Sequence, residues 1–189
     1  MLQKAGAYLD DYVEDRESDP WTVYSYYISQ TGEDGSFESM QMQTDLAGGK
    51  MRVGDSGQLT AAYTLAGIAA DVTWTSDNPD VLTVDEDGTV TAVSNGIVTV
   101  TAEDALGRTT KMDVYAFAGD PNTRISGDVD LDSSVGLLDV VKITRTLAGG
   151  WNERIYEINA DVNTDGEINL KDAVLIRRYL AGGWNIELK

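Results

Sequence analysis

Oxygen-bearing side chains recur at alternate positions in two stretches near the C-terminal end of the chain. The first stretch has Asp128, Asp130 and Asp132, the second has Asp161, Asn163 and Asp165, and Asp139 or Asp172 stands at the twelfth place of each. Alternating oxygens closed by a carboxylate are the pattern that wraps six to eight ligands around Ca²⁺. The spacing therefore predicts two calcium loops and a requirement for two Ca²⁺ ions.

The remaining loop places fit the same chemistry but differ between the copies. The seventh place, Ser134 or Glu167, would offer its backbone carbonyl, and the ninth, Gly136 or Asn169, would act through water. The sixth place needs a sharp turn with positive φ, which Gly166 provides in the second loop. The first loop has Ser133 there, so we expect its site to bind Ca²⁺ more weakly.

Crowded carboxylates repel one another when no cation lies between them. We therefore expect folding of this region to depend on calcium, so that EDTA changes its circular dichroism spectrum and its thermal melt. The alternative is a pair of solvated acidic loops that bind nothing.

The two loops belong to one unit that is repeated with an offset of 33 residues. Each loop is followed by a predicted helix, which begins at Asp139 or Asp172 and stops at Gly149-Gly150 or Gly182-Gly183. The predicted apolar stripes are Val140, Val141, Ile143 and Leu147 in the first helix, and Val174, Leu175, Ile176 and Leu180 in the second. Residues 119–126 do not read as a helix, so each unit is half an EF-hand.

Residues 125–189 resemble a type I dockerin, on the duplicated loop, the closing Asp, the basic helix and the repeated Leu-Ala-Gly-Gly-Trp ending. The resemblance implies a small all-α module that docks onto a cohesin domain of a bacterial scaffoldin in a cellulosome-like complex. It also implies the partner-binding residues: Leu137, Leu138, Val141, Thr144 and Arg145 in the first copy, and Leu170, Lys171, Val174, Arg177 and Arg178 in the second.

The two predicted partner-binding faces are not equivalent. Leu138 corresponds to Lys171, and Thr144 corresponds to Arg177, so the first face is more apolar and the second more basic. We expect one face to dominate. Trp184 could fold back to clasp the ends of the module, or it could simply pack in a core, as Trp151 would.

Residues 40–118 alternate Thr and Val with turn-forming residues. Seven short strands are predicted, at 50–53, 58–65, 72–75, 81–84, 89–93, 97–101 and 110–116, which favours an all-β sandwich with Trp74 in its core. The runs 72–84, 87–93 and 96–102 resemble the bacterial Ig-like group 2 family, which implies a spacer or adhesion role without catalysis. The acidic turn residues Asp77, Asp80, Asp85 and Asp87 are interpreted as solvated rather than as a cation site.

Composition excludes several functions. The chain of 189 residues has 32 acidic against 14 basic side chains and a net charge of -18, which would repel nucleic acid. It has no Cys and no His, so disulfides, thiolate metal sites and His-based catalysis are absent. No membrane span and no signal peptide are predicted, and we predict no enzyme within this chain.

The predicted organisation is an N-terminal helix and strand segment at 1–39, the Ig-like sandwich at 40–118, a linker at 119–124 and the docking module at 125–189. The first segment is interpreted as a helix and strand that cap the sandwich, or as the remnant of an upstream domain, and sugar stacking on its aromatic residues is an alternative. We interpret the chain as part of a longer secreted or cell-surface bacterial protein. The alternatives are an adhesin that binds carbohydrate or a cell surface through the sandwich, and a fragment of a glycoside hydrolase whose catalytic domain is missing.

Overall fold

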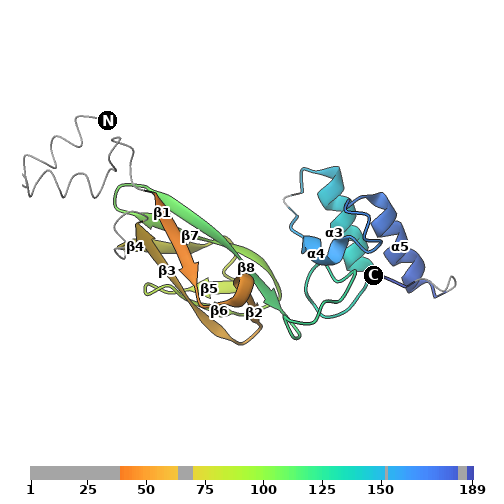
Figure 1. Cartoon of the computed structure of the whole chain (residues 1–189), viewed down its shortest axis with the longest axis horizontal. Coiled ribbons are helices and arrows are strands. Elements are labelled where there is room, and N and C mark those ends of the chain that lie inside the picture. The colour runs from red at the N-terminus through yellow and green to blue at the C-terminus, as the bar shows by residue number, and fades with distance from the viewer. Residues whose placement is uncertain (1–38, 64–69, 152, 183–186) are drawn as a thin grey trace, which may run out of the picture.

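The computed structural model describes residues 39–63, 70–151, 153–182 and 187–189 (Figure 1). Two parts follow one another along the long axis of the described structure: a β-sandwich and a small helical module. The predictions for residues 1–38 and for Trp184 lie outside the described residues. Among the described residues, no helix has both the length and the apolar character needed to cross a membrane.

The sandwich consists of two four-stranded sheets, ordered β1-β3-β6-β5 and β2-β8-β7-β4. The β2 strand pairs with β8 in parallel, and all other neighbouring strands are antiparallel. The elements are β1 (Met40–Thr44), the short helix η1 (Ala47–Gly49), β2 (Lys50–Arg52), β3 (Ser56–Tyr63), β4 (Val72–Ser76), β5 (Leu82–Val84), β6 (Thr89–Ala92), β7 (Gly96–Asp104) and β8 (Thr109–Phe117). All seven predicted strands are present, and β1 was not predicted.

The alternation of apolar and polar residues along the strands produces the core of the sandwich. Every second residue of β7 faces inward, so Val98 and Val100 are fully buried, and they pack with Leu59, Val90 and Val114. Trp74 packs against this cluster but is only partly buried. The expectation that Trp74 lies in the core is therefore confirmed only in part, because aliphatic side chains fill the centre of the sandwich.

The helical module contains α3 (Leu137–Ala148), α4 (Glu157–Ala160) and α5 (Leu170–Leu180). The short α4 was not predicted. The prediction that the helices begin at Asp139 and Asp172 is wrong by two residues. Each Asp is the third helical residue, and its side chain accepts the backbone N–H of the N-cap residue, Gly136 or Asn169. Both helices end just before the glycine pairs, as predicted.

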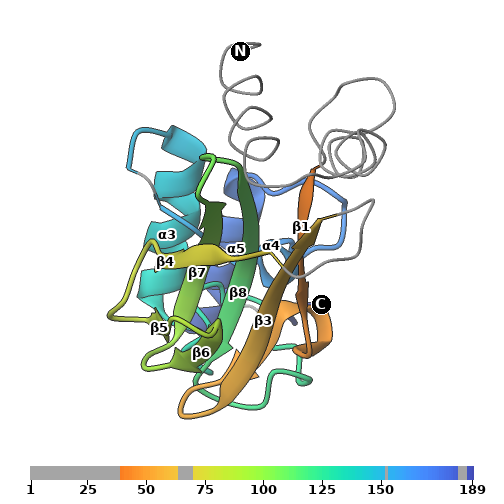
Figure 2. The same cartoon turned by 90° about the vertical axis from the view of Figure 1, so that its left-hand side faces the viewer.

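The repeated units share one core. Val129 and Ile143 from the first copy pack with their counterparts Val162 and Ile176, and α3 lies against α5. The predicted apolar stripes are only partly correct, because Val141, Leu147, Val174 and Leu180 are exposed. A helix turns 100° per residue, so only about half of such a broad stripe can face a small core. Figure 2 shows the sandwich in front of the helices, which lie beyond it.

Candidate metal centre and partner-binding edge

Three carboxylates of the first loop converge in the interior of the module. Asp128, Asp130 and Asp139 each place one oxygen within 4.8 Å of the others. All three residues are buried, and Asp139 is only 1% exposed. Among the described residues, no other set of three acidic side chains gathers this closely. The structure thus brings together three of the predicted calcium ligands.

The loop backbone holds these carboxylates in place. The Asp139 carboxylate accepts the N–H of Val129 at 2.8 Å and that of Gly136 at 2.7 Å. Asp128 accepts the N–H groups of Asp132 and Ser133, both at 3.1 Å. The closing Asp therefore connects the loop to the first turn of α3, and whatever fixes the loop also fixes the start of the helix.

The second loop repeats this hydrogen-bond pattern. Asp172 accepts the N–H of Val162 at 3.2 Å and that of Asn169 at 2.9 Å. Asp161 accepts the N–H groups of Asp165 at 3.2 Å and Gly166 at 2.9 Å. These four hydrogen bonds match those of the first loop one by one, which supports one function for both loops.

Burial sets the electrostatics of the first loop. Burial raises the pKa of Asp128 to about 6, and the neighbouring charges of Asp139, Asp132 and Asp130 add to the rise, while the Ser133 N–H opposes it. Burial is also the largest cause of the raised pKa of Asp130 and of Asp139. Burial makes the ionised form of these carboxyl groups unfavourable unless a cation lies beside them. A hard divalent cation, which prefers oxygen ligands, would fit such a site.

The other predicted acidic ligands are not part of this group of three carboxylates. Asp132 is exposed, and its carboxylate accepts the N–H of Ser134 at 2.8 Å. In the second loop, Asp165 accepts from the Asn163 amide at 3.1 Å and lies 3.6 Å from the Lys171 ammonium. The backbone of both loops follows the predicted turn.

Two loop positions adopt a left-handed backbone. The sixth place does so as predicted, with φ of 72° at Ser133 and 83° at Gly166. The fourth place does so too, with φ of 66° at Leu131 and 60° at Thr164, and this was not predicted. Neither Leu nor Thr favours positive φ, so residue type gave no signal there.

The predicted partner-binding leucines lie exposed at the start of each helix. Leu137 is 66% and Leu138 54% exposed in the first copy, and Leu170 is 63% exposed in the second. Val141 and Val174 extend these edges along α3 and α5. Exposed aliphatic groups in such continuity are a candidate protein-binding edge, which we name the α3 edge (137, 138 and 141) and the α5 edge (170 and 174).

The predicted basic and polar contacts differ between the copies. Arg145 stacks over the Trp151 ring at 5.0 Å and lies 3.6 Å from the Glu153 carboxylate, which also accepts a 2.7 Å hydrogen bond from Lys142. Thr144 donates its hydroxyl to the backbone of its own helix. Arg177, Arg178 and Lys171 are all exposed on α5. Arg145 is also exposed, and its contacts are with Trp151 and Glu153 of the same module.

Comparison with known families identifies both parts. Residues 50–113 match "Bacterial Ig-like domain (group 2)" and residues 126–181 match "Dockerin type I domain". Neither is a catalytic module. A comparison with curated proteins gives no match.

Solved structures of intimin are similar to part of the chain. A mutant of intimin from EHEC O157:H7 is 21% identical with a TM-score of 0.35, over 42% of this chain and 46% of that one. The intimin-Tir90 complex is 19% identical with a TM-score of 0.35, over 41% of this chain and 46% of that one. The chain spans less than half the length of these two structures.

Proposed function

We propose that this chain, a bacterial Ig-like domain followed by a type I dockerin domain, docks in a calcium-dependent manner onto a cohesin domain of a scaffoldin. In this way it would anchor its parent secreted protein in a cellulosome-like, polysaccharide-degrading complex, with the Ig-like domain as a spacer. The observation that carries the proposal is the exposed leucine edge at the start of each helix, directly joined to a calcium-type loop.

The proposed ligand sets are those of the two loops. They are Asp128, Asp130, Asp132, Ser134 and Asp139 in the first, and Asp161, Asn163, Asp165, Glu167 and Asp172 in the second. When bound, Ca²⁺ supplies the positive charge that the buried carboxylates lack. Asp139 and Asp172 each cap a helix that begins with the edge leucines, so loop order and edge geometry are linked.

The leucine edges supply the affinity in this proposal. Burying a leucine side chain at an interface contributes on the order of 2 kcal/mol, and apolar anchors near arginines are typical of binding hot spots. Lys171, Arg177 and Arg178 on α5 favour a partner with acidic groups around the contact. The α3 edge is more apolar, and Arg145 beside it contacts Trp151 and Glu153, so we expect the two edges to bind with different strengths.

The test is binding of the full chain to a panel of type I cohesins by isothermal titration calorimetry, in Ca²⁺ and in EDTA. We expect binding to at least one cohesin in Ca²⁺ and none in EDTA. Two double variants, L137A/L138A in the α3 edge and K171A/R177A beside the α5 edge, test the two predicted partner-binding faces, and we expect unequal losses of affinity. Leu106→Ala is the matched control, because Leu106 is 64% exposed on the sandwich, away from both edges.

Failure to bind any cohesin in Ca²⁺ would contradict the docking proposal. Equal losses from the two double variants would contradict a dominant edge. Retention on insoluble polysaccharide without any cohesin would instead favour an adhesin that acts through the sandwich.

A further inference from the structure

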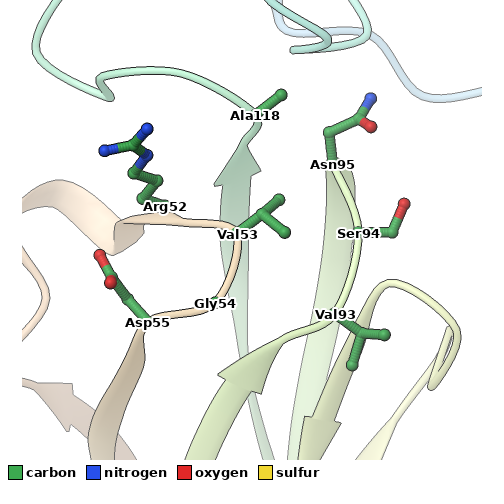
Figure 3. A pocket seen from close by; sticks show the side chains of 8 residues that line it. All are labelled: Arg52, Val53, Gly54, Asp55, Val93, Ser94, Asn95 and Ala118. Carbon is green, nitrogen blue, oxygen red and sulfur yellow. The ribbon is translucent and has the colours of Figure 1, made fainter.

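The first calcium-type loop is in direct contact with the Ig-like domain. The Asn95 side-chain amide donates to the Asp130 carbonyl at 2.9 Å, and the Ala118 N–H donates to the Leu131 carbonyl at 2.9 Å. Figure 3 shows Asn95 and Ala118 among the residues that line one hollow of the sandwich, together with residues 52–55, 93 and 94. Two successive carbonyls of the loop are therefore fixed from outside the module.

The side chain of Leu131 is buried in the same contact. It is 0% exposed and packs with Phe117, the last residue of β8, and with Tyr156, which precedes α4. Its counterpart in the second copy, Thr164, is exposed. Phe117 belongs to the sandwich and Tyr156 to the helical module, so the Leu131 side chain lies where the two parts meet. Thr164 has the same left-handed backbone without such a contact, so the contact buries the first loop but does not set its φ.

A second set of contacts fixes the segment before α4 to the outer face of β7 and β8. Arg154 donates to the Thr99 hydroxyl at 2.8 Å and lies 2.7 Å from the Asp113 carboxylate. The Tyr156 ring meets Tyr115 edge-on at 5.2 Å and Phe117 at 5.4 Å. The module is thus held at two points, and the loop cannot change shape independently of the sandwich.

The linker adds a steric constraint on the same loop. A Cβ atom placed on Gly119 would collide with the Ser133 side chain, so the chain passes directly against the sixth loop position. Ser133 is the residue that stands where the second loop has Gly166. The residue type that is less suited to positive φ therefore lies in the loop that contacts the sandwich.

We propose that the Ig-like domain holds the first calcium loop in its binding shape, with Asn95 as the positioning residue that acts through the Asp130 carbonyl. This inference rests on the proposed calcium loading of the module. A loop that is already ordered loses less conformational entropy on binding, so its affinity rises. The second loop makes no such contact among the described residues, so the effect is specific to the first.

The experiment is a chelator-buffered Ca²⁺ titration of the ¹⁵N-labelled full chain, followed by NMR. The Ser133 amide, which donates to Asp128, reports on the first loop, and the Gly166 amide, which donates to Asp161, reports on the second. We expect Asn95→Ala to weaken Ca²⁺ binding at the first loop by roughly threefold to tenfold, the value of one hydrogen bond, and to leave the second unchanged. Asn95→Asp, which replaces the donor by an acceptor, should weaken it further.

Gln43→Ala is the matched control, because it removes an exposed amide side chain elsewhere on the sandwich, on β1. Unchanged resonances of the buried Val98 and Val114 amides would show that the sandwich remains folded in each variant. Equal effects on both loops, or no effect on the first, would overturn the inference while leaving calcium-dependent docking intact. A wild-type chain whose loop amides ignore Ca²⁺ would instead overturn the proposed function itself.

Discussion

Asp128 makes the first loop sensitive to pH. Its pKa is raised to about 6, mainly by burial, so between pH 4 and 6 the folded, calcium-free chain holds a proton that the unfolded chain has released. The stability contributed by this group is therefore present below about pH 4 and lost as the pH rises through 6. Ca²⁺ must displace the same proton, so acid should weaken its binding.

We expect Ca²⁺ affinity at the first loop to fall by up to about tenfold between pH 7 and pH 5, because one pH unit below a pKa of about 6 leaves roughly a tenth of the carboxylate ionised. The measurement is the same NMR titration at both pH values, read at the Ser133 amide. An affinity that does not change with pH would contradict the raised pKa of Asp128.

At the residue scale, the alternation of oxygen side chains predicted which acidic side chains of the first loop lie close together. The structure brings together Asp128, Asp130 and Asp139 as that spacing requires. The left-handed backbone of Leu131 was not predictable from residue type, and neither was the burial of its side chain against Phe117 and Tyr156, which are distant in the sequence. The contact of Asn95 with the Asp130 carbonyl was not predictable either, because it joins two domains that lie apart in the sequence.

At the scale of elements, the turn between β5 and β6 depends on one glycine. Gly88 has φ of 81°, and a Cβ atom there would lie 2.5 Å from the Leu59 carbonyl oxygen and 3.0 Å from the Trp74 ring. The Gly88 carbonyl also accepts the Leu59 N–H at 2.9 Å, so the turn cannot move away from β3 without losing a bond. A side chain at position 88 would therefore suffer both backbone strain from the positive φ and a collision with Leu59.

We expect Gly88→Ala to destabilise the sandwich by about 3 kcal/mol, from the left-handed backbone and the steric clash together. Gly107→Ala is the control, because Gly107 has φ of 78° and a Cβ atom added there would meet no other atom within 4 Å, so it should cost only about 1 kcal/mol. Amide hydrogen exchange at Val98 and Val114 would measure both. Equal losses would mean that the collision at Gly88 is relieved by movement.

The prediction of elements succeeded for seven of the eight strands and for α3 and α5, and it missed β1, α4 and the first residues of both long helices. The strands from β2 to β8 follow an alternation that residue type alone reveals. The helices α3 and α5 begin two residues earlier than predicted, because the closing Asp serves as both loop residue and capping residue. The four-residue α4 is too short for any periodic signal.

At the scale of the whole molecule, Arg154 joins the two domains. Burial of Asp113 acts to raise its pKa, but hydrogen bonds from Arg154 and Thr99 and the charge of Arg154 hold that pKa below its usual value. Asp77 lies 3.5 Å from the same guanidinium. The docking module and the sandwich thus share one ion-pair network, and we expect them to tumble in solution as one body.

Reversing the charge at this point should separate the domains. Arg154→Glu places a third carboxylate beside Asp113 and Asp77, and like charges at this distance repel. We expect ¹⁵N relaxation in Ca²⁺ to give one rotational correlation time for the wild-type chain, and two different ones for the variant. Arg177→Glu on exposed α5 is the control for the same charge change, and it should leave the domains joined. If Arg154→Glu still tumbles as one body, the packing around Tyr156 and Leu131 is sufficient without the ion pairs.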